Sequence, residues 1–203
     1  MKRRGSRDSL TPQVRIGEDA GRAALLVDGV VQSISLEDGL ADGGYWAAMV
    51  PDARPRRALI LGLGGGTLAR LLHARWGGNV RIVGVDDDAL IVETAQAAGW
   101  LAVPGLEVVL CDAFTYVQAA RERFDYVAVD LFRGERLAAR VFGKPFLRRL
   151  GSVLEPRGWL AVNFFRDQME AVRYERLAAA FEIRACRHVG GNTIVHASPR
   201  RGT

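Results

Sequence analysis

The chain has 203 residues, of which 49% are hydrophobic, which suits one globular domain with a substantial core. No apolar run is long enough to span a membrane, so we expect no membrane anchor. No apolar stretch follows the charged N-terminus, so we expect no secretory signal and therefore a cytoplasmic location. The net charge of +5 comes from the two ends of the chain, which argues against a specific nucleic-acid groove in the body.

The composition also argues against a metal site. The chain has two cysteines, Cys111 and Cys186, and their spacing is typical of neither a zinc site nor a disulfide framework. We therefore expect no metal and two buried strand thiols.

The first quarter of the chain predicts a small β-rich element. Residues 1–12 form a basic tail that we expect to be disordered. Residues 13–50 hold short apolar runs separated by the turn signals GEDAGR and DG, followed by ADGGYWAAMV before Pro51. This pattern predicts two or three short strands and then a short helix.

Residues 51–198 alternate between apolar strand-like runs and amphipathic helix-like runs, ahead of a short tail at 199–203. Strands are expected at 57–63, 79–85, 106–111, 124–130 and 158–164, and helices at 67–76, 88–99, 113–121, 144–154 and 166–180. Fully apolar strands between helices indicate a parallel sheet covered on both faces. The runs 181–189 and 192–198 around two glycines read as a hairpin. The predicted fold is α/β and Rossmann-like, with a mostly parallel seven-stranded sheet that ends in an antiparallel pair.

A glycine-rich turn, LGLGGGTLAR, lies between the first parallel strand and its helix. Gly62, Gly64, Gly65 and Gly66 allow the backbone to approach a ligand, and Thr67 can cap the helix. A P-loop is excluded because no Lys-Ser/Thr pair follows. The turn alone fits a dinucleotide, an adenosyl cofactor, or tight packing without a ligand.

Three further strand ends carry acids at the edge where ligands bind in such sheets. Asp86, about twenty residues past the glycines, is a candidate for the ribose hydroxyls of NAD or of an adenosyl sulfonium. Asp112, followed by Ala113, is a candidate to accept a hydrogen bond from an adenine amino group. Asp130 could accept a proton from an amine nucleophile or stabilise a sulfonium. Capping of the following helix or loop is the structural alternative for each acid.

These residues together resemble the spermidine synthase family, whose fold is that of class I S-adenosylmethionine-dependent methyltransferases. LLVDGVVQ and YWAAM are similar to the family's LDG-x-x-Q strand and Tyr-x-x-Met helix, which implies that Gln32 and Tyr45 face the active site. DDDALIVETA, CDAFTYV and FDYVAVD are similar to its later motifs. The resemblance implies ribose binding by Asp86, adenine binding by Asp112 and catalysis by Asp130, with no metal.

Three positions depart from the family pattern. Gly65 stands where the family has an Asp expected to hold the amine of decarboxylated S-adenosylmethionine. Arg133 replaces the second Asp of Asp-Ser-Ser-Asp, which holds a polyamine ammonium, and would suit an acidic substrate. Asn163 stands in place of a glutamine. These departures place Arg133 and Asn163 in the expected substrate site.

The departures favour S-adenosylmethionine over its decarboxylated form, and methyl transfer to an unknown small acceptor over aminopropyl transfer in polyamine biosynthesis. Two other classes remain open: a non-catalytic adenosyl-binding protein, and an NAD-dependent oxidoreductase, which would leave Asp112 unused. The resemblance also implies a possible homodimer.

Overall fold

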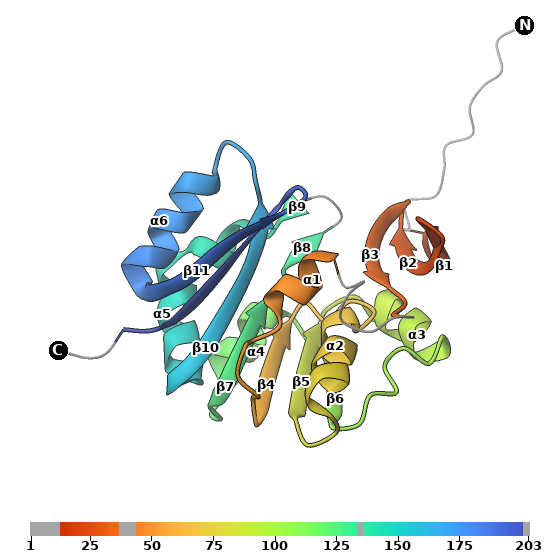
Figure 1. The fold of residues 1–203 in the computed structure, drawn as a ribbon, viewed down its shortest axis with the longest axis horizontal. Coiled ribbons are helices and arrows are strands. Elements are labelled where there is room, and N and C mark those ends of the chain that lie inside the picture. The colour runs from red at the N-terminus through yellow and green to blue at the C-terminus, as the bar shows by residue number, and fades with distance from the viewer. Residues whose placement is uncertain (1–12, 37–43, 134–135, 201–203) are drawn as a thin grey trace, which may run out of the picture.

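The computed structural model describes residues 13–36, 44–133 and 136–200 (Figure 1). An antiparallel sheet of three strands opens the described chain, and it comprises β1 (Val14–Asp19), β2 (Arg22–Val27) and β3 (Val30–Ile34). Each hairpin turns through two residues with positive φ, Ala20–Gly21 and Asp28–Gly29, which matches the twist of paired strands. The predicted N-terminal strands are confirmed.

The main sheet has seven strands in the order β11-β12-β10-β7-β4-β5-β6. Their bounds are β4 (Arg57–Leu61), β5 (Arg81–Asp86), β6 (Leu106–Leu110), β7 (Phe124–Val129), β10 (Leu154–Phe165), β11 (Phe181–Val189) and β12 (Asn192–Pro199). The five strands from β10 to β6 are parallel, and β12 pairs antiparallel with both β10 and β11. The predicted fold class, including the terminal hairpin, is confirmed.

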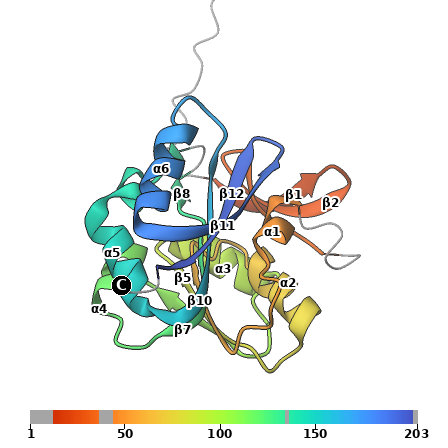
Figure 2. The same ribbon diagram turned by 60° about the vertical axis from the view of Figure 1, so that its left-hand side comes forward.

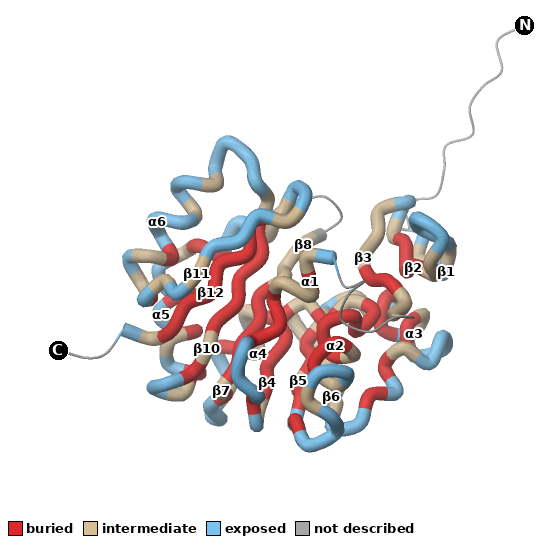
Figure 3. The backbone as a smooth tube through the Cα atoms, viewed as in Figure 1, coloured by how far each residue is buried: buried red, intermediate tan, exposed pale blue. Residues whose placement is uncertain are grey.

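Helices cover both faces of this sheet (Figures 1 and 2). Their bounds are α1 (Gly44–Met49), α2 (Thr67–Trp76), α3 (Ala89–Ala97), α4 (Ala113–Ala119), η2 (Ala139–Phe142), α5 (Lys144–Val153) and α6 (Glu170–Ala180). One hydrophobic cluster joins α1, α2, α3 and the N-terminal sheet to one face, and a second joins α4, η2, α5 and α6 to the other. Alternate strand residues supply the two clusters, as in Leu59 and Ile60, so the buried sheet runs through the centre of the molecule (Figure 3).

The N-terminal sheet is tied to the beginning of α2. The backbone N–H of Ile34 donates to the hydroxyl of buried Thr67 at 3.1 Å, and that hydroxyl also contacts the Ile34 carbonyl at 3.3 Å. Arg70 on the same helix donates to this carbonyl at 2.7 Å. The sheet is therefore held against the glycine turn that precedes α2.

Some details differ from the sequence-based expectation. Cys186 is exposed and Cys111 is partly buried, so the expectation of two buried thiols was wrong. The reason is that Cys186 lies on β11, an edge strand whose outward residues face solvent. The small hairpin of β8 (Phe132–Arg133) and β9 (Arg136–Leu137) was not predicted. None of the helices in the described residues is long and apolar enough to cross a membrane.

Candidate active site

The glycine turn lies close against the end of β7. At Gly62, where φ is +87°, a Cβ atom would lie 2.1 Å from the carbonyl oxygen of Asp130, so only glycine fits. The backbone N–H of Gly62 donates to the Val85 carbonyl at 2.9 Å, which ties the turn to β5 as well. The turn thereby brings Gly64 and the ends of β5 and β7 to one side of a cavity.

The last two glycines of the turn, Gly65 and Gly66, are buried. The N–H of Gly65 donates to the hydroxyl of Ser33 at 2.7 Å, and a Cβ at this position would lie 2.8 Å from the Cβ of Ser33. Gly66 has φ of +79° and precedes the first residue of α2. Neither glycine lines the cavity, so both shape the turn rather than face a ligand. The missing acid at Gly65 thus has a packing reason: Ser33 occupies the space.

Asp86 ends β5 and faces the cavity beside the glycine turn. One carboxylate oxygen accepts from the N–H of Gly64 at 2.8 Å, and the other accepts from the N–H of Asp88 at 3.0 Å. Burial raises the pKa of Asp86, and these two hydrogen bonds oppose that rise. Asp88 caps α3 by accepting from the N–H groups of Leu90 and Ile91. Each Asp86 oxygen retains a lone pair that can accept a further hydrogen bond.

Asp112 follows β6 and caps α4. Its Oδ1 accepts from the N–H and the hydroxyl of Thr115 at 2.8 and 2.9 Å, and its Oδ2 lies 3.4 Å from Arg140 of η2. These interactions lower the pKa of Asp112 against the opposing effect of desolvation. Ala113 and Phe114 line the cavity next to it, and the guanidinium of Arg140 lies 4.1 Å above the Phe114 ring. Asp112 therefore caps α4, and its carboxylate also borders the cavity.

Asp130 directly follows β7 and lies at the centre of a hydrogen-bond cluster. Its Oδ2 accepts from the hydroxyl of Tyr45 and from the indole Nε1 of Trp46, each at 3.1 Å. Its Oδ1 accepts from Nδ2 of Asn163, on β10, at 2.8 Å. The rings of Tyr45 and Trp46 stack with their centroids 4.1 Å apart. Three neutral donors from two elements thus fix the orientation of this carboxylate.

Burial decides the protonation behaviour of the cluster. Desolvation raises the pKa of Asp130 to about 6, although the hydrogen bonds from Asn163, Tyr45 and Trp46 each oppose the rise. The pKa of Tyr45 is raised far above its ordinary value by burial and by the neighbouring carboxylate, so its hydroxyl remains a donor. Near neutral pH Asp130 is therefore mostly ionised and can accept a proton.

The cavity that these groups line has a volume of about 1210 Å³. Of the residues proposed from the sequence, it is lined by Gln32, Tyr45, Gly62, Gly64, Asp86, Asp112, Ala113, Asp130 and Asn163. Arg133 belongs to β8, but its side chain lies outside the part of the chain that the structure describes. In the described ranges no three His, Cys, Asp or Glu side chains gather so as to hold a metal ion.

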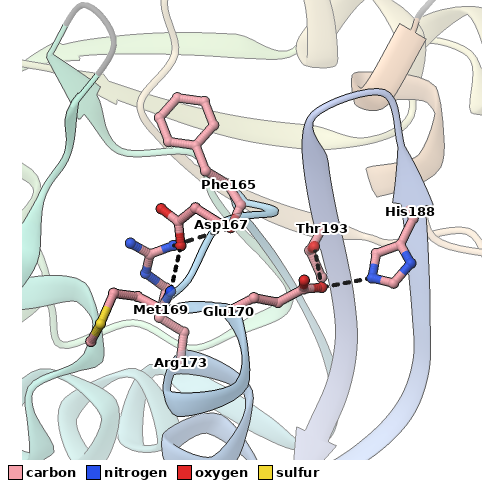
Figure 4. Close-up of polar contacts among 7 residues, drawn as sticks. All are labelled: Phe165, Asp167, Met169, Glu170, Arg173, His188 and Thr193. Carbon is pink, nitrogen blue, oxygen red and sulfur yellow. Dashed lines mark hydrogen bonds and ion pairs between the residues drawn. The ribbon is translucent and has the colours of Figure 1, made fainter.

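The far wall of the cavity comes from β8, β10 and the terminal hairpin. The rings of Phe132 and Phe165 pack edge to face with centroids 4.8 Å apart, and both residues line the cavity. The carbonyl of Phe165 accepts from Arg173 at 3.1 Å, which also pairs with Asp167 at 2.7 Å (Figure 4). These contacts tie the end of β10 to α6.

The same helix is tied to the terminal hairpin. Glu170, the first residue of α6, accepts from the hydroxyl of Thr193 at 2.7 Å and lies 2.6 Å from Nε2 of His188 (Figure 4). Both contacts lower the pKa of Glu170. The hairpin that supplies cavity residue Asn192 is thereby held beside the wall.

Sequence reasoning missed Trp46, although a spacing signal pointed to it. The similar family helix reads Tyr-x-x-Met, and the residue three positions before Met49 is Trp46, whereas Tyr45 is four positions before it. In the structure both side chains reach Asp130. Ser33 and Arg140 were missed as well, because their contacts join segments far apart in the sequence.

Comparison with known sequences gives a domain family and relatives that agree with each other. The spermine/spermidine synthase domain profile matches residues 46–197. A polyamine aminopropyltransferase of Neisseria meningitidis is 29% identical over 134 residues, covering 64% of this chain and 51% of the relative. Polyamine aminopropyltransferase 1 of Hyperthermus butylicus is 30% identical over 150 residues, which cover 68% of this chain and 51% of the relative. The chain therefore spans about half the length of the curated relatives it matches.

Comparison with solved structures supports the fold. A probable spermidine synthase from Corynebacterium glutamicum has a TM-score of 0.74 at 16% identity, and the superposition covers 98% of this chain and 81% of the chain of that synthase. A spermidine synthase in complex with the transition state analogue AdoDATO has a TM-score of 0.67 at 19% identity, with 94% and 70% covered. Human methyltransferase-like protein 13, in complex with SAH, has a TM-score of 0.62 at 25% identity, with 73% and 74% covered. Because the domain profile spans most of the chain and the fold agrees, the chain belongs to the spermine/spermidine synthase family.

Proposed function

We propose that this protein transfers an aminopropyl group from decarboxylated S-adenosylmethionine to an amine of a small acceptor. The observation that carries the proposal is Asp130, an ionisable carboxylate in the cavity that Tyr45, Trp46 and Asn163 orient. The curated relatives, which are polyamine aminopropyltransferases, support this reaction over the methyl transfer that the sequence favoured.

The residues present fit an adenosyl cofactor. The carboxylate of Asp86 borders the cavity with a free lone pair on each oxygen, which suits the paired hydroxyls of a ribose. Asp112 and Ala113 would border the adenine, as the next strand end along the same edge. Gly64 and Gln32 line the part of the cavity nearest the glycine turn and would hold the sulfonium end.

Asp130 would serve as the base. When bound in the cavity, the cofactor would supply a carbon activated by its sulfonium; this carbon would bond to the amine nitrogen of the acceptor as its C–S bond breaks and a thioether leaves. Asp130 takes the proton that this nitrogen loses, so charge does not accumulate on the product. The donors from Tyr45 and Trp46 hold one carboxylate oxygen and leave the other to Asn163 and the acceptor. Most of the acceleration would come from orienting the two reactants.

The wall beyond Asp130 would bind the acceptor. Phe132 and Phe165 offer an apolar surface, and Asn163 and Asn192 offer amides. The aromatic rings would pack on the carbon chain of the acceptor, while Asp130 orients its reacting nitrogen.

Methyl transfer is the second candidate, and one observation favours it. No acid stands at Gly65 to hold the amine that decarboxylated S-adenosylmethionine presents, because Ser33 fills that space. The human neighbour in complex with SAH shows that this fold also accommodates the product of methyl transfer in a relative at 25% identity.

The test is binding followed by turnover. Isothermal titration calorimetry with S-adenosylmethionine, its decarboxylated form and NADH would identify the ligand. Incubation with a panel of diamines and monoamines, read by mass spectrometry, would then identify the transferred group. We expect tighter binding of the decarboxylated form and an aminopropylated amine. A methylated product would contradict the proposal in favour of methyl transfer, adenosyl binding without turnover would favour a non-catalytic protein, and NADH binding alone would favour an oxidoreductase.

A further inference from the structure

His196 on β12 is a buried histidine that lies outside the cavity lining. His196 is 2% exposed, and each nitrogen of its ring has a partner. Nδ1 lies 2.7 Å from Nε1 of Trp159 on β10, and Nε2 lies 2.7 Å from the carbonyl oxygen of Ala48 in α1. Because an indole N–H can only donate and a carbonyl can only accept, Nδ1 must accept and Nε2 must carry the proton. The surroundings therefore specify a neutral imidazole in one tautomer.

The helix that His196 contacts cannot hold its position alone. α1 has six residues, and helices this short are unstable without tertiary contacts. The carbonyl of Ala48 is held by His196 from β12, and the next carbonyl, that of Met49, accepts from the buried hydroxyl of Tyr126 on β7 at 2.7 Å. The last-turn carbonyls of a helix lack partners within it, so these two side chains satisfy and anchor that end.

The other end of α1 carries the contacts to the carboxylate at the centre of the site. Tyr45 and Trp46 follow the first residue of the helix, and both donate to one oxygen of Asp130 at 3.1 Å. Hydrogen bonds of this length weaken steeply when the donor moves or rotates. A shift of α1 along or about its axis would thus change the environment of Asp130.

We propose that His196 is a positioning residue, whose neutral imidazole joins β10 and β12 to the end of α1 and thereby sets Tyr45 and Trp46 against Asp130. It touches neither the cavity nor a reacting atom. Its effect on turnover rests on the proposed function, but its effect on the protonation of Asp130 does not.

The arrangement is sensitive to acid. A proton added to Nδ1 would face the N–H of Trp159, so two donors would meet and the bond to β10 would be lost. Burial lowers the pKa of His196, and Arg187 on β11 lowers it further, whereas the hydrogen bond to Ala48 and the charge of Asp52 after α1 oppose the change. Both hydrogen bonds of His196, to Trp159 and to Ala48, are therefore present at neutral pH, and the bond to Trp159 is lost as the pH falls.

Two substitutions separate the two bonds. In His196→Gln the amide NH₂ lies near the place of Nε2 and can still donate to Ala48, whereas in His196→Asn the amide oxygen lies near the place of Nδ1 and keeps only the bond to Trp159. His188→Gln is the matched control, because His188 lies on the same hairpin but contacts Glu170 of α6 (Figure 4), whereas His196 contacts Ala48 of α1.

The readout is the titration of Asp130, followed by carbon NMR of its carboxyl group and assigned with Asp130→Asn. We expect the pKa of Asp130 to rise in His196→Asn and to stay near the wild-type value in His196→Gln and His188→Gln. Equal titration in all folded variants would overturn the proposal. Nitrogen NMR of the three histidines in the unaltered protein is a second test, since a charged His196 or a proton on Nδ1 at neutral pH would also overturn it.

Turnover measured in parallel separates this proposal from the proposed function. If an aminopropylated product forms, we expect kcat of His196→Asn to be about tenfold lower with KM nearly unchanged. If the unaltered protein shows no turnover, the proposed function fails while the titration of Asp130 still decides the role of His196.

Discussion

The indole Nε1 of Trp46 and the carboxylate Oδ2 of Asp130 are separated by 3.1 Å. The donor comes from a helix that precedes the main sheet, and the acceptor directly follows the central strand of that sheet. The hydroxyl of Tyr45 reaches the same oxygen. Two stacked aromatic donors therefore favour the ionised form of the proposed base and oppose the effect of burial on its pKa, and this relationship yields the first prediction.

Trp46→Phe should raise the pKa of Asp130 above its value of about 6, because the substitution removes one donor to the ionised form and keeps the ring that stacks on Tyr45. The acid limb of the kcat/KM profile should move to higher pH. The control is Trp76→Phe, since the indole nitrogen of Trp76 is buried without a hydrogen-bond partner. An unshifted limb in Trp46→Phe would show that this hydrogen bond does not influence the base.

Asp130→Asn should abolish most turnover, by a factor of about 10² to 10⁴, since it removes the proton acceptor. The same substitution should stabilise the fold at high pH. The folded carboxyl has a pKa of about 6 against 3.8 for the ordinary group, so the native protein loses stability as the pH rises from about 4 to 6 and does not regain it above.

The neutral amide avoids this cost, which amounts to at most about 3 kcal/mol. The amide of Asn163 can rotate so that its buried, unpartnered Oδ1 accepts from the new NH₂ group. Thermal unfolding at pH 8 and pH 4 checks this, with a gain in melting temperature at pH 8 that is absent at pH 4. A loss of stability at pH 8 would contradict the burial of an ionised Asp130.

Gly65→Ala should destabilise the protein by about 1–3 kcal/mol, because the new Cβ would lie 2.8 Å from the Cβ of Ser33. Ser33→Gly loses the hydroxyl that accepts from the Gly65 N–H, but it removes the contact at 2.8 Å and leaves the 3.2 Å contact of the new Cβ with Trp100. The double substitution should therefore be more stable than the sum of the two single changes predicts, as measured by denaturant unfolding. Simple additivity would mean that Ser33 does not restrict this position.

Asp86→Ala should weaken binding of the adenosyl cofactor at least about tenfold, since both ribose hydroxyls would lose their acceptor. Asp88→Ala is the matched control: it removes the cap of α3, at a cost of about 1 kcal/mol, and leaves the Asp86 carboxylate in place. Calorimetry separates the two effects. Equal affinity loss in both variants would assign the effect to the loop rather than to Asp86.

Much of the fold could be predicted because the local patterns agree with it. The apolar strands, the glycine turn before Thr67 and the Gly190–Gly191 hairpin all appear in the structure as the sequence indicates. The hairpin of β8 and β9 could not be predicted, since two-residue strands have no periodicity to detect.

The site could be predicted where a residue ends or follows a strand, and at Gln32 and Tyr45, where the sequence is similar to a family motif. Asp86, Asp112 and Asp130 follow from that rule and border one cavity. Ser33 depends on a contact between segments that the sequence does not relate, the 2.7 Å hydrogen bond that its hydroxyl accepts from the N–H of Gly65 across 32 residues. Trp46 stands at the tyrosine position of the Tyr-x-x-Met spacing, but its 3.1 Å contact with Asp130 across 84 residues comes from the fold and not from a local pattern.

The most direct test of the proposed function is mass spectrometry of the product formed from an equimolar mixture of S-adenosylmethionine and its decarboxylated form with a panel of amines. The proposed function predicts an amine heavier by one aminopropyl group, formed only when the decarboxylated cofactor is present and lost in Asp130→Asn. A methylated product, or aminopropyl transfer that persists in Asp130→Asn, would contradict this account of the site.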